Sequence, residues 1–97
     1  MHLDIPHKFP SQEAAVAKVK QALDEGRSKL DGKATIEEER WDGDTLNFGV
    51  NIQGQSIAGT LAVEEHQFVL DAKLPLLWRM FEGKIEGAIK ENLGQFL

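Results

Sequence analysis

The feature that most constrains the fold is a run of alternating apolar and polar residues from Leu46 to Leu74. Successive side chains of a β-strand point to opposite faces of a sheet, so this alternation predicts strands with one apolar face, covered on that side only. Two-residue turns at Gly54-Gln55 and Glu65-His66 would divide the run into three antiparallel strands. Across the first turn, the predicted pairs are Ile52 with Ile57, Val50 with Gly59, Phe48 with Leu61 and Leu46 with Val63. Across the second turn, they are Val63 with Phe68, Leu61 with Leu70, Gly59 with Ala72 and Ile57 with Leu74.

The strand that leads into these hairpins fits the pattern less well. Pairing Trp41 with Leu46 would point the carboxylates of Glu37 and Glu39 toward the apolar face. A β-bulge would instead turn Ile36 inward, and inward charges on an edge strand also protect against edge-to-edge aggregation. Because unpaired buried charge is costly, we expect an irregular, charged edge strand over the Glu37–Glu39 segment and not a buried pair of carboxylates.

Two helices are predicted to flank the strands. Ser11 is a predicted N-cap, and the apolar residues after it share one side of a helix that should run to about Leu30 and end at Gly32. After Pro75 the apolar period changes to about 3.6 residues, which predicts a second helix. Its apolar stripe comprises Leu77, Trp78, Phe81, Ile85, Ala88, Ile89 and Phe96.

A short strand at the N-terminus completes the predicted elements. Leu3 and Ile5 alternate there with His2 and Asp4 before Pro6. The predicted order is therefore β-α-β-β-β-β-α, with both helices on the apolar side of the sheet. This order predicts one α+β domain over residues 1–97, in which two helices cover one face of an antiparallel meander sheet in two layers.

Charge and composition exclude several classes of protein. The net charge of −5, from 11 basic and 16 acidic residues, offers no basic patch for nucleic acid. The absence of cysteine excludes disulfides and thiolate metal sites. The N-terminus lacks the pattern of a signal peptide, and the longest apolar run, Leu74 to Trp78, is too short for a transmembrane segment. We expect a soluble cytoplasmic protein.

No catalytic constellation is found in the sequence. Ser11, Ser28 and Ser56 are better explained as a cap, an exposed helix position and a turn residue. His7 and His66 fall in or near predicted loops, where we expect them to be solvated, and no histidine pair has metal-ligand spacing. The chain is therefore expected not to be an enzyme, and to use neither a metal nor a cofactor.

The candidate binding surface lies at the start of the second helix. The segment from Leu74 to Phe81 holds more apolar residues than one buried stripe can absorb, and Leu76 and Met80 are left over. They could either seal the end of a small core or, with Trp78 and Arg79, contact an apolar surface or a partner protein. A small apolar ligand between the helices and the sheet is the alternative use of this region.

The predicted second helix also carries a stripe of glycines that its apolar stripe does not explain. Gly83, Gly87 and Gly94 lie beside Met80 with almost no charge, and such spacing lets another helix approach closely. We expect the first helix, through Gly26, to pack there, with contact between two copies of the chain as the alternative. A homodimer could also form through the outer sheet face, which carries Ala58, Thr60 and Ala62.

A distinctive pattern spans nearly the whole chain and comprises Ile5-x-His7, Glu13-Ala14, Trp41-x-Gly43-Asp44-x-Leu46-x-Phe48, Gly59-x-Leu61-x-Val63, and Leu74 followed by Phe81, Ile85, Ile89 and Leu93. In this pattern the sequence resembles the polyhydroxyalkanoic acid system (granule-region) family of small bacterial proteins. The resemblance implies a bacterial protein connected with storage polyester, but no reaction that can be assigned to residues. We therefore expect a non-enzymatic protein that binds a polyester granule surface or a partner protein through the start of the C-terminal helix.

Overall fold

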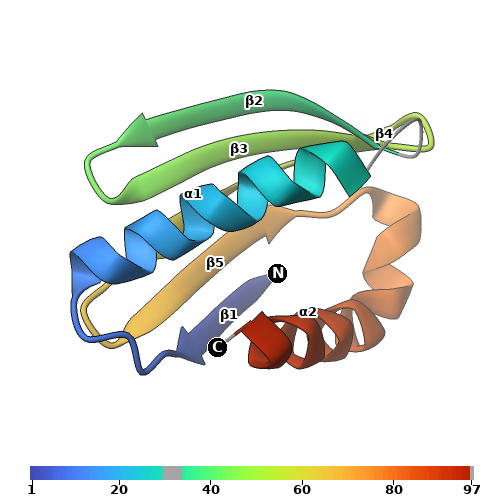
Figure 1. The fold of residues 1–97 in the computed structure, drawn as a ribbon. Helices are drawn as coiled ribbons and strands as arrows, with labels where there is room; N and C mark the ends of the chain where they lie inside the picture. The colour runs from blue at the N-terminus through green and yellow to red at the C-terminus, as the bar shows by residue number, and fades with distance from the viewer. Residues whose placement is uncertain (30–33, 97) are drawn as a thin grey trace.

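The computed structural model describes residues 1–29 and 34–96 (Figure 1). Its elements are β1 (His2–Pro6), α1 (Gln12–Lys29), β2 (Ala34–Asp42), β3 (Thr45–Ile52), β4 (Gln55–Val63), β5 (Gln67–Lys73), the 3-10 helix η1 (Leu76–Phe81) and α2 (Glu82–Phe96). The strands form one five-stranded antiparallel sheet in the order β1-β5-β4-β3-β2. This arrangement confirms the predicted α+β class and the predicted order of elements.

Both helices lie on the apolar face of the sheet, with β5 and β1 visible between them in Figure 1. The best-packed part of the core lies where α1 begins, because Ala15 is completely buried there. β1 joins this core by pairing with β5, so that Leu3 lies opposite Leu70 and Ile5 opposite Phe68. The buried core cluster comprises Leu3, Ile5, Ala15, Val63 and Phe68.

The start of α1 follows the predicted capping pattern. The backbone N–H of Ala14 donates to the Ser11 hydroxyl at 3.1 Å, which satisfies one of the free donors at the helix end. Gln12 then donates its side-chain amide to the carbonyl of Val63 at 2.8 Å and ties the helix to the end of β4. The predicted end of the helix, at Leu30 and Gly32, lies outside the described residues.

One predicted hairpin register is confirmed and another is wrong. Across the β4–β5 turn, Val63 lies opposite Phe68 and Leu61 opposite Leu70, as predicted, although the ladder ends at Lys73. Between β3 and β4 the turn is Gln53-Gly54, so every predicted pair is displaced by two residues. The observed pairs are Leu46 with Leu61, Phe48 with Gly59, Val50 with Ile57 and Ile52 with Gln55.

The physical reason for this correction lies in the turn. Gln53 and Gly54 both have positive φ, at 53° and 81°, which is the backbone of a type I′ hairpin turn. Glycine is preferred at the second of these positions, and Asn51 accepts a hydrogen bond from the Gly54 N–H at 3.0 Å. A displacement of two residues leaves each side chain on its predicted face, so the apolar face itself is as expected.

The irregular edge strand expected at Glu37–Glu39 is confirmed. Trp41 lies opposite Leu46, and a β-bulge between Ile36 and Glu38 brings Ile36 opposite Val50. Glu37 lies on the outer side of the sheet, where it accepts a hydrogen bond from Ser56 at 2.9 Å. The carboxylates of this edge remain exposed.

The chain after Pro75 departs from the single predicted helix. It forms η1 first and then α2. Because a 3-10 helix has about three residues per turn, the apolar stripe of α2 does not continue into η1. Leu77 and Phe81, expected to face the core, are instead 73% and 53% exposed, which corrects that prediction. Ile85 and Ile89 of α2 are half-buried against the sheet.

Candidate functional site

The structure presents a cluster of exposed apolar side chains on η1. Their exposures are 78% for Leu76, 73% for Leu77, 84% for Met80 and 53% for Phe81, and we call these four residues the η1 patch. Single exposed apolar residues are common, but several large ones on consecutive turns mark an interaction surface. Leu76 and Met80 therefore do not seal the core, which was the alternative explanation of their presence.

The other two predicted residues of this surface differ from each other. Arg79 is exposed beside the η1 patch, whereas Trp78 is half-buried and turns toward the sheet. The predicted four residues thus lie on one short segment but not on one surface, and Leu77 and Phe81 join the exposed set in place of Trp78.

A hollow of about 500 Å³ lies between α2 and the sheet, next to Trp78. Its walls are apolar: Ile85 and Ile89 come from α2, and Phe48, Val50 and Leu70 come from the strands. The α-amino group of Met1, which also lines this hollow, lies 3.1 Å from the Glu82 carboxylate and donates to the carbonyl of Ala72 at 2.8 Å. These contacts hold the first turn of α2 over the end of β5.

A second hollow, of about 320 Å³, lies between α1 and the strands on the other side of the same face. It is lined by Val19 and Leu23 of α1, and it shares Phe48, Val50 and Leu70 with the first hollow. The two hollows therefore adjoin each other on the inner face of the sheet, and we call them together the apolar trough. The two helices stand apart on this face (Figure 1).

The glycine stripe does not have the predicted neighbour. A Cβ built at Gly83 or Gly87 would meet no atom within 4 Å, and neither would one at Gly26 of α1. The expected packing of the first helix against the stripe is therefore wrong: the helices diverge, and Gly83 and Gly87 face solvent. The surroundings of Gly94 lie outside the described part of α2.

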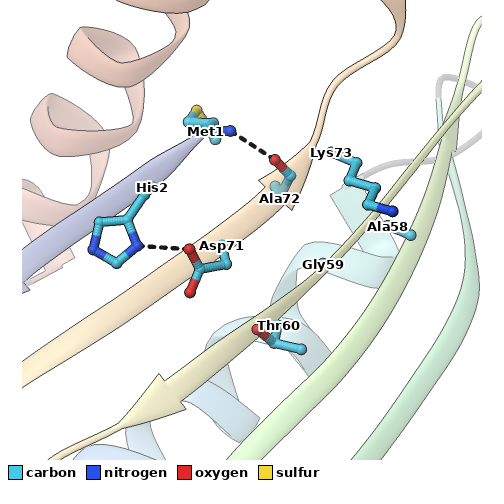
Figure 2. A pocket seen from close by; sticks show the side chains of 8 residues that line it. All are labelled: Met1, His2, Ala58, Gly59, Thr60, Asp71, Ala72 and Lys73. Carbon is cyan, nitrogen blue, oxygen red and sulfur yellow. Dashed lines mark hydrogen bonds and ion pairs between the residues drawn. The ribbon is translucent and has the colours of Figure 1, made fainter.

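On the opposite face of the sheet, a shallow depression of about 620 Å³ surrounds His2 and Asp71 (Figure 2). His2 Nδ1 lies 2.6 Å from Asp71, and its Nε2 lies 3.2 Å from Asp4. The hydrogen bond with Asp71, reinforced by the charges of Asp71 and Asp4, raises the pKa of His2. Since both ring nitrogens are engaged, this group acts as a cross-strand clamp between β1 and β5.

His7 is the residue that the sequence interpretation misplaced. It is 6% exposed and not solvated, and its ring contacts Phe9 and Phe68. Nε2 donates to the carbonyl of Glu64 at 2.8 Å, while Nδ1 accepts the N–H of Phe9 at 3.2 Å. A signal was present, because His7 continues the inward alternation of Leu3 and Ile5.

Two other kinds of site are absent from the described residues. Within residues 1–29 and 34–96, no group of three histidine or acidic side chains is arranged to hold a metal ion. In the same ranges, neither α1 nor α2 combines the length and hydrophobicity that a bilayer-spanning helix needs.

The fold and these surfaces define a small two-layer α+β domain whose distinctive features are apolar and lie along η1 and α2. A family model described as "Putative polyhydroxyalkanoic acid system protein (PHA_gran_rgn)" matches residues 1–97, the whole chain. The chain belongs to this family, as the resemblance of its sequence indicated. Comparisons with curated proteins and with solved structures gave no match.

Proposed function

We propose that this protein is a non-enzymatic, cytoplasmic component of the bacterial polyhydroxyalkanoate system that binds the polyester granule surface through the η1 patch. The observation that supports this proposal is the exposure of Leu76, Leu77, Met80 and Phe81 on one short helix. The family to which the chain belongs supplies the identity of the surface.

The exposed apolar side chains of the η1 patch favour weak, reversible surface binding. Full burial of one large apolar side chain contributes roughly 1.5–3 kcal/mol. The four side chains of the η1 patch therefore offer a gross gain of at most roughly 6–12 kcal/mol, because they are already partly covered. Association itself costs roughly 4–15 kcal/mol, so we expect the patch alone to bind weakly and reversibly.

The charge of the protein favours polyester over a membrane. A polyester chain is uncharged, whereas the cytoplasmic leaflet of a membrane is anionic and would repel a protein of net charge −5. The basic residues Arg79 and Lys84 lie next to the patch. However, Glu82 lies between them in the sequence, and Glu86 follows Lys84. The apolar side chains, and not electrostatic attraction, are therefore expected to dominate binding.

Co-sedimentation with bare polyhydroxybutyrate particles tests this proposal directly. We expect the wild-type protein to pellet with the particles and Met80→Asp to bind roughly tenfold more weakly or worse, because one large apolar contact is lost. Ala58→Asp is the matched control, since it adds the same charge at an exposed position on the outer face of the sheet. Neutral and anionic lipid vesicles, added separately, measure the preference for polyester.

The proposal fails if wild-type protein ignores the particles or if Met80→Asp binds them equally well. Binding only to native granules that retain their own proteins would instead identify a partner protein as the occupant of the η1 patch.

A carrier of a small apolar ligand is the second candidate function. The observation that favours it is the hollow of about 500 Å³ between α2 and the sheet, which lies within the size range of small-molecule sites. Mass spectrometry of an organic extract from natively purified protein tests this function. A stoichiometric apolar compound would support it, and an empty protein that also fails to take up an added lipophilic dye would contradict it.

The oligomeric state is a separate part of the proposal. Gly83 and Gly87 are exposed and leave room for the close approach of a second α2, so we propose a homodimer through this face. Light scattering of the wild type and of Gly87→Leu tests it: a dimer that becomes a monomer on substitution supports this interface, and a monomeric wild type excludes it.

A further inference from the structure

We infer that the apolar trough binds an uncharged linear acyl ester, with its chain extended across the inner face of the sheet from α2 toward α1. This inference rests on the proposed function, because the polyester of a granule is itself a chain of uncharged aliphatic esters. It adds a site distinct from the η1 patch and a chemical class for the ligand.

The side chains on the inner face of the sheet are unevenly buried. Protein interiors are packed about as densely as organic crystals, and the middle of a sheet is normally its best-buried part. Here Phe48, Val50 and Leu61, at the centre of the middle strands, are only half-buried. Leu46, Val63 and Phe68, at one end of the same strands, are buried, as are Leu3 and Ile5 of the edge strand. An apolar occupant over the middle strands would complete the core.

The shape of the trough favours an extended ligand. The hollows of about 500 Å³ and about 320 Å³ meet at Phe48, Val50 and Leu70 and open toward different helices. Each lies within the size range of small-molecule sites. A ligand that occupies both hollows must pass from one to the other at these residues, which suits an extended chain better than a compact ring system.

The charge of the trough favours an uncharged ligand. Among the described residues that line the trough, the cationic group is the α-amino group of Met1, which is already engaged by Glu82 and by the carbonyl of Ala72. The acidic residues Glu38 and Glu39 lie at the α1 end. A fatty-acid carboxylate would enter this trough without a cationic partner at large cost, whereas an ester would not.

The fluorescence of a tryptophan in the trough can report ligand binding. Trp78 lines the hollow under α2, while the other tryptophan, Trp41, lies on β2 with the Lys20 ammonium 5.2 Å from its ring centroid. In a Trp41→Phe variant, the intrinsic fluorescence comes from Trp78 alone. Titration of this variant with methyl octanoate and, separately, with octanoate compares two ligands of the same chain length that differ in charge.

We expect methyl octanoate to produce a saturable change in Trp78 fluorescence and octanoate to bind roughly tenfold more weakly or worse. Val50→Phe, which fills the junction of the two hollows, should weaken ester binding by roughly tenfold or more. Val69→Phe is the matched control, because Val69 lies on the outer face between Asp4 and Ala62. It should bind the ester as the parent protein does.

Three results would overturn the inference: no saturable response to the ester, equal affinity for octanoate, or unchanged binding by a folded Val50→Phe variant. If Val50→Phe does not fold, methyl chemical-shift mapping of the wild type decides the question. Ester-induced shifts at Val50, Leu70 and Ile85 support the trough, whereas shifts confined to Leu76 and Leu77 contradict it.

The outcome is independent of the granule assay. Protein that pellets with polyester particles but does not bind methyl octanoate would retain the proposed function and lose the trough site. Protein that binds the ester in solution but ignores the particles would retain the trough site and lose surface binding.

Discussion

His2 and Asp71 form a short contact across the two strands β1 and β5, with 2.6 Å between the imidazole Nδ1 and the carboxylate. The hydrogen bond that the His2 imidazole donates to Asp71 is the main reason that the pKa of His2 is raised above 6.5, and the charges of Asp71 and Asp4 act in the same direction. This pair joins the first strand of the chain to the last, and its strength depends on the charge of the imidazole.

The pair should therefore make stability depend on pH. Because the pKa of His2 is higher in the folded than in the unfolded protein, its contribution is complete below pH 6.5 and is lost as the pH rises through the folded pKa. Thermal unfolding from roughly pH 6 to 8 should show this loss for the wild type and a flatter profile for Asp71→Asn. His66→Gln, at the exposed β4–β5 turn, should keep the wild-type profile; parallel profiles for Asp71→Asn and wild type would contradict the assignment.

The buried ring of His7 should be essential for stability and not for binding. His7→Ala leaves the carbonyl of Glu64 and the N–H of Phe9 without their partners and removes the packing against Phe68, at a cost of roughly 2–4 kcal/mol. Urea denaturation measures this cost, with the exposed His66→Ala as the control. A loss similar to that of the control would mean that the ring contributes little to the core.

Two glycine-to-alanine substitutions should have opposite effects. A Cβ at Gly59 would overlap the backbone oxygen of Asp71, so Gly59→Ala should prevent folding or cost several kcal/mol. A Cβ at Gly87 meets no atom within 4 Å in an exposed position of α2. At protein concentrations too low for the proposed dimer to form, Gly87→Ala should therefore stabilise the monomer by roughly 0.5–1 kcal/mol through its helix propensity. The denaturant midpoints of the two variants measure both changes in stability. Destabilisation by Gly87→Ala would indicate that another helix contacts the stripe.

The apolar face of the sheet could be predicted from the sequence, because a period of two depends only on the local backbone. The same period explains the error in the β3–β4 register. Displacement by two residues leaves Phe48 and Val50 facing inward whether the turn begins at Gln53 or at Gly54, so hydrophobic pattern alone does not distinguish the two pairings. Turn chemistry does not distinguish them either, because Gly54 suits the second position of a type I′ turn and also the first position of a type II′ turn.

The candidate sites were less predictable, because they depend on how the helices are placed. The surplus of apolar residues at Leu76 and Met80 was visible in the sequence, but the phase shift that exposes Leu77 and Phe81 arises from a 3-10 helix. The apolar trough arises because α1 and α2 diverge over Phe48 and Val50. The spacing between two packed elements is a tertiary property that the periodicity of either element does not contain.

The β3–β4 turn provides a last prediction that follows from its register. Gln53 adopts φ of 53°, a left-handed conformation that is costly for most side chains but well tolerated by asparagine. Gln53→Asn should therefore stabilise the protein by up to roughly 1 kcal/mol, whereas Gln55→Asn, the matched change at the first residue of β4, should not stabilise it. Denaturant unfolding of both variants measures the difference. If Gln55→Asn were the stabilising change, the turn would be centred at Gly54-Gln55, and the register observed between β3 and β4 would be wrong.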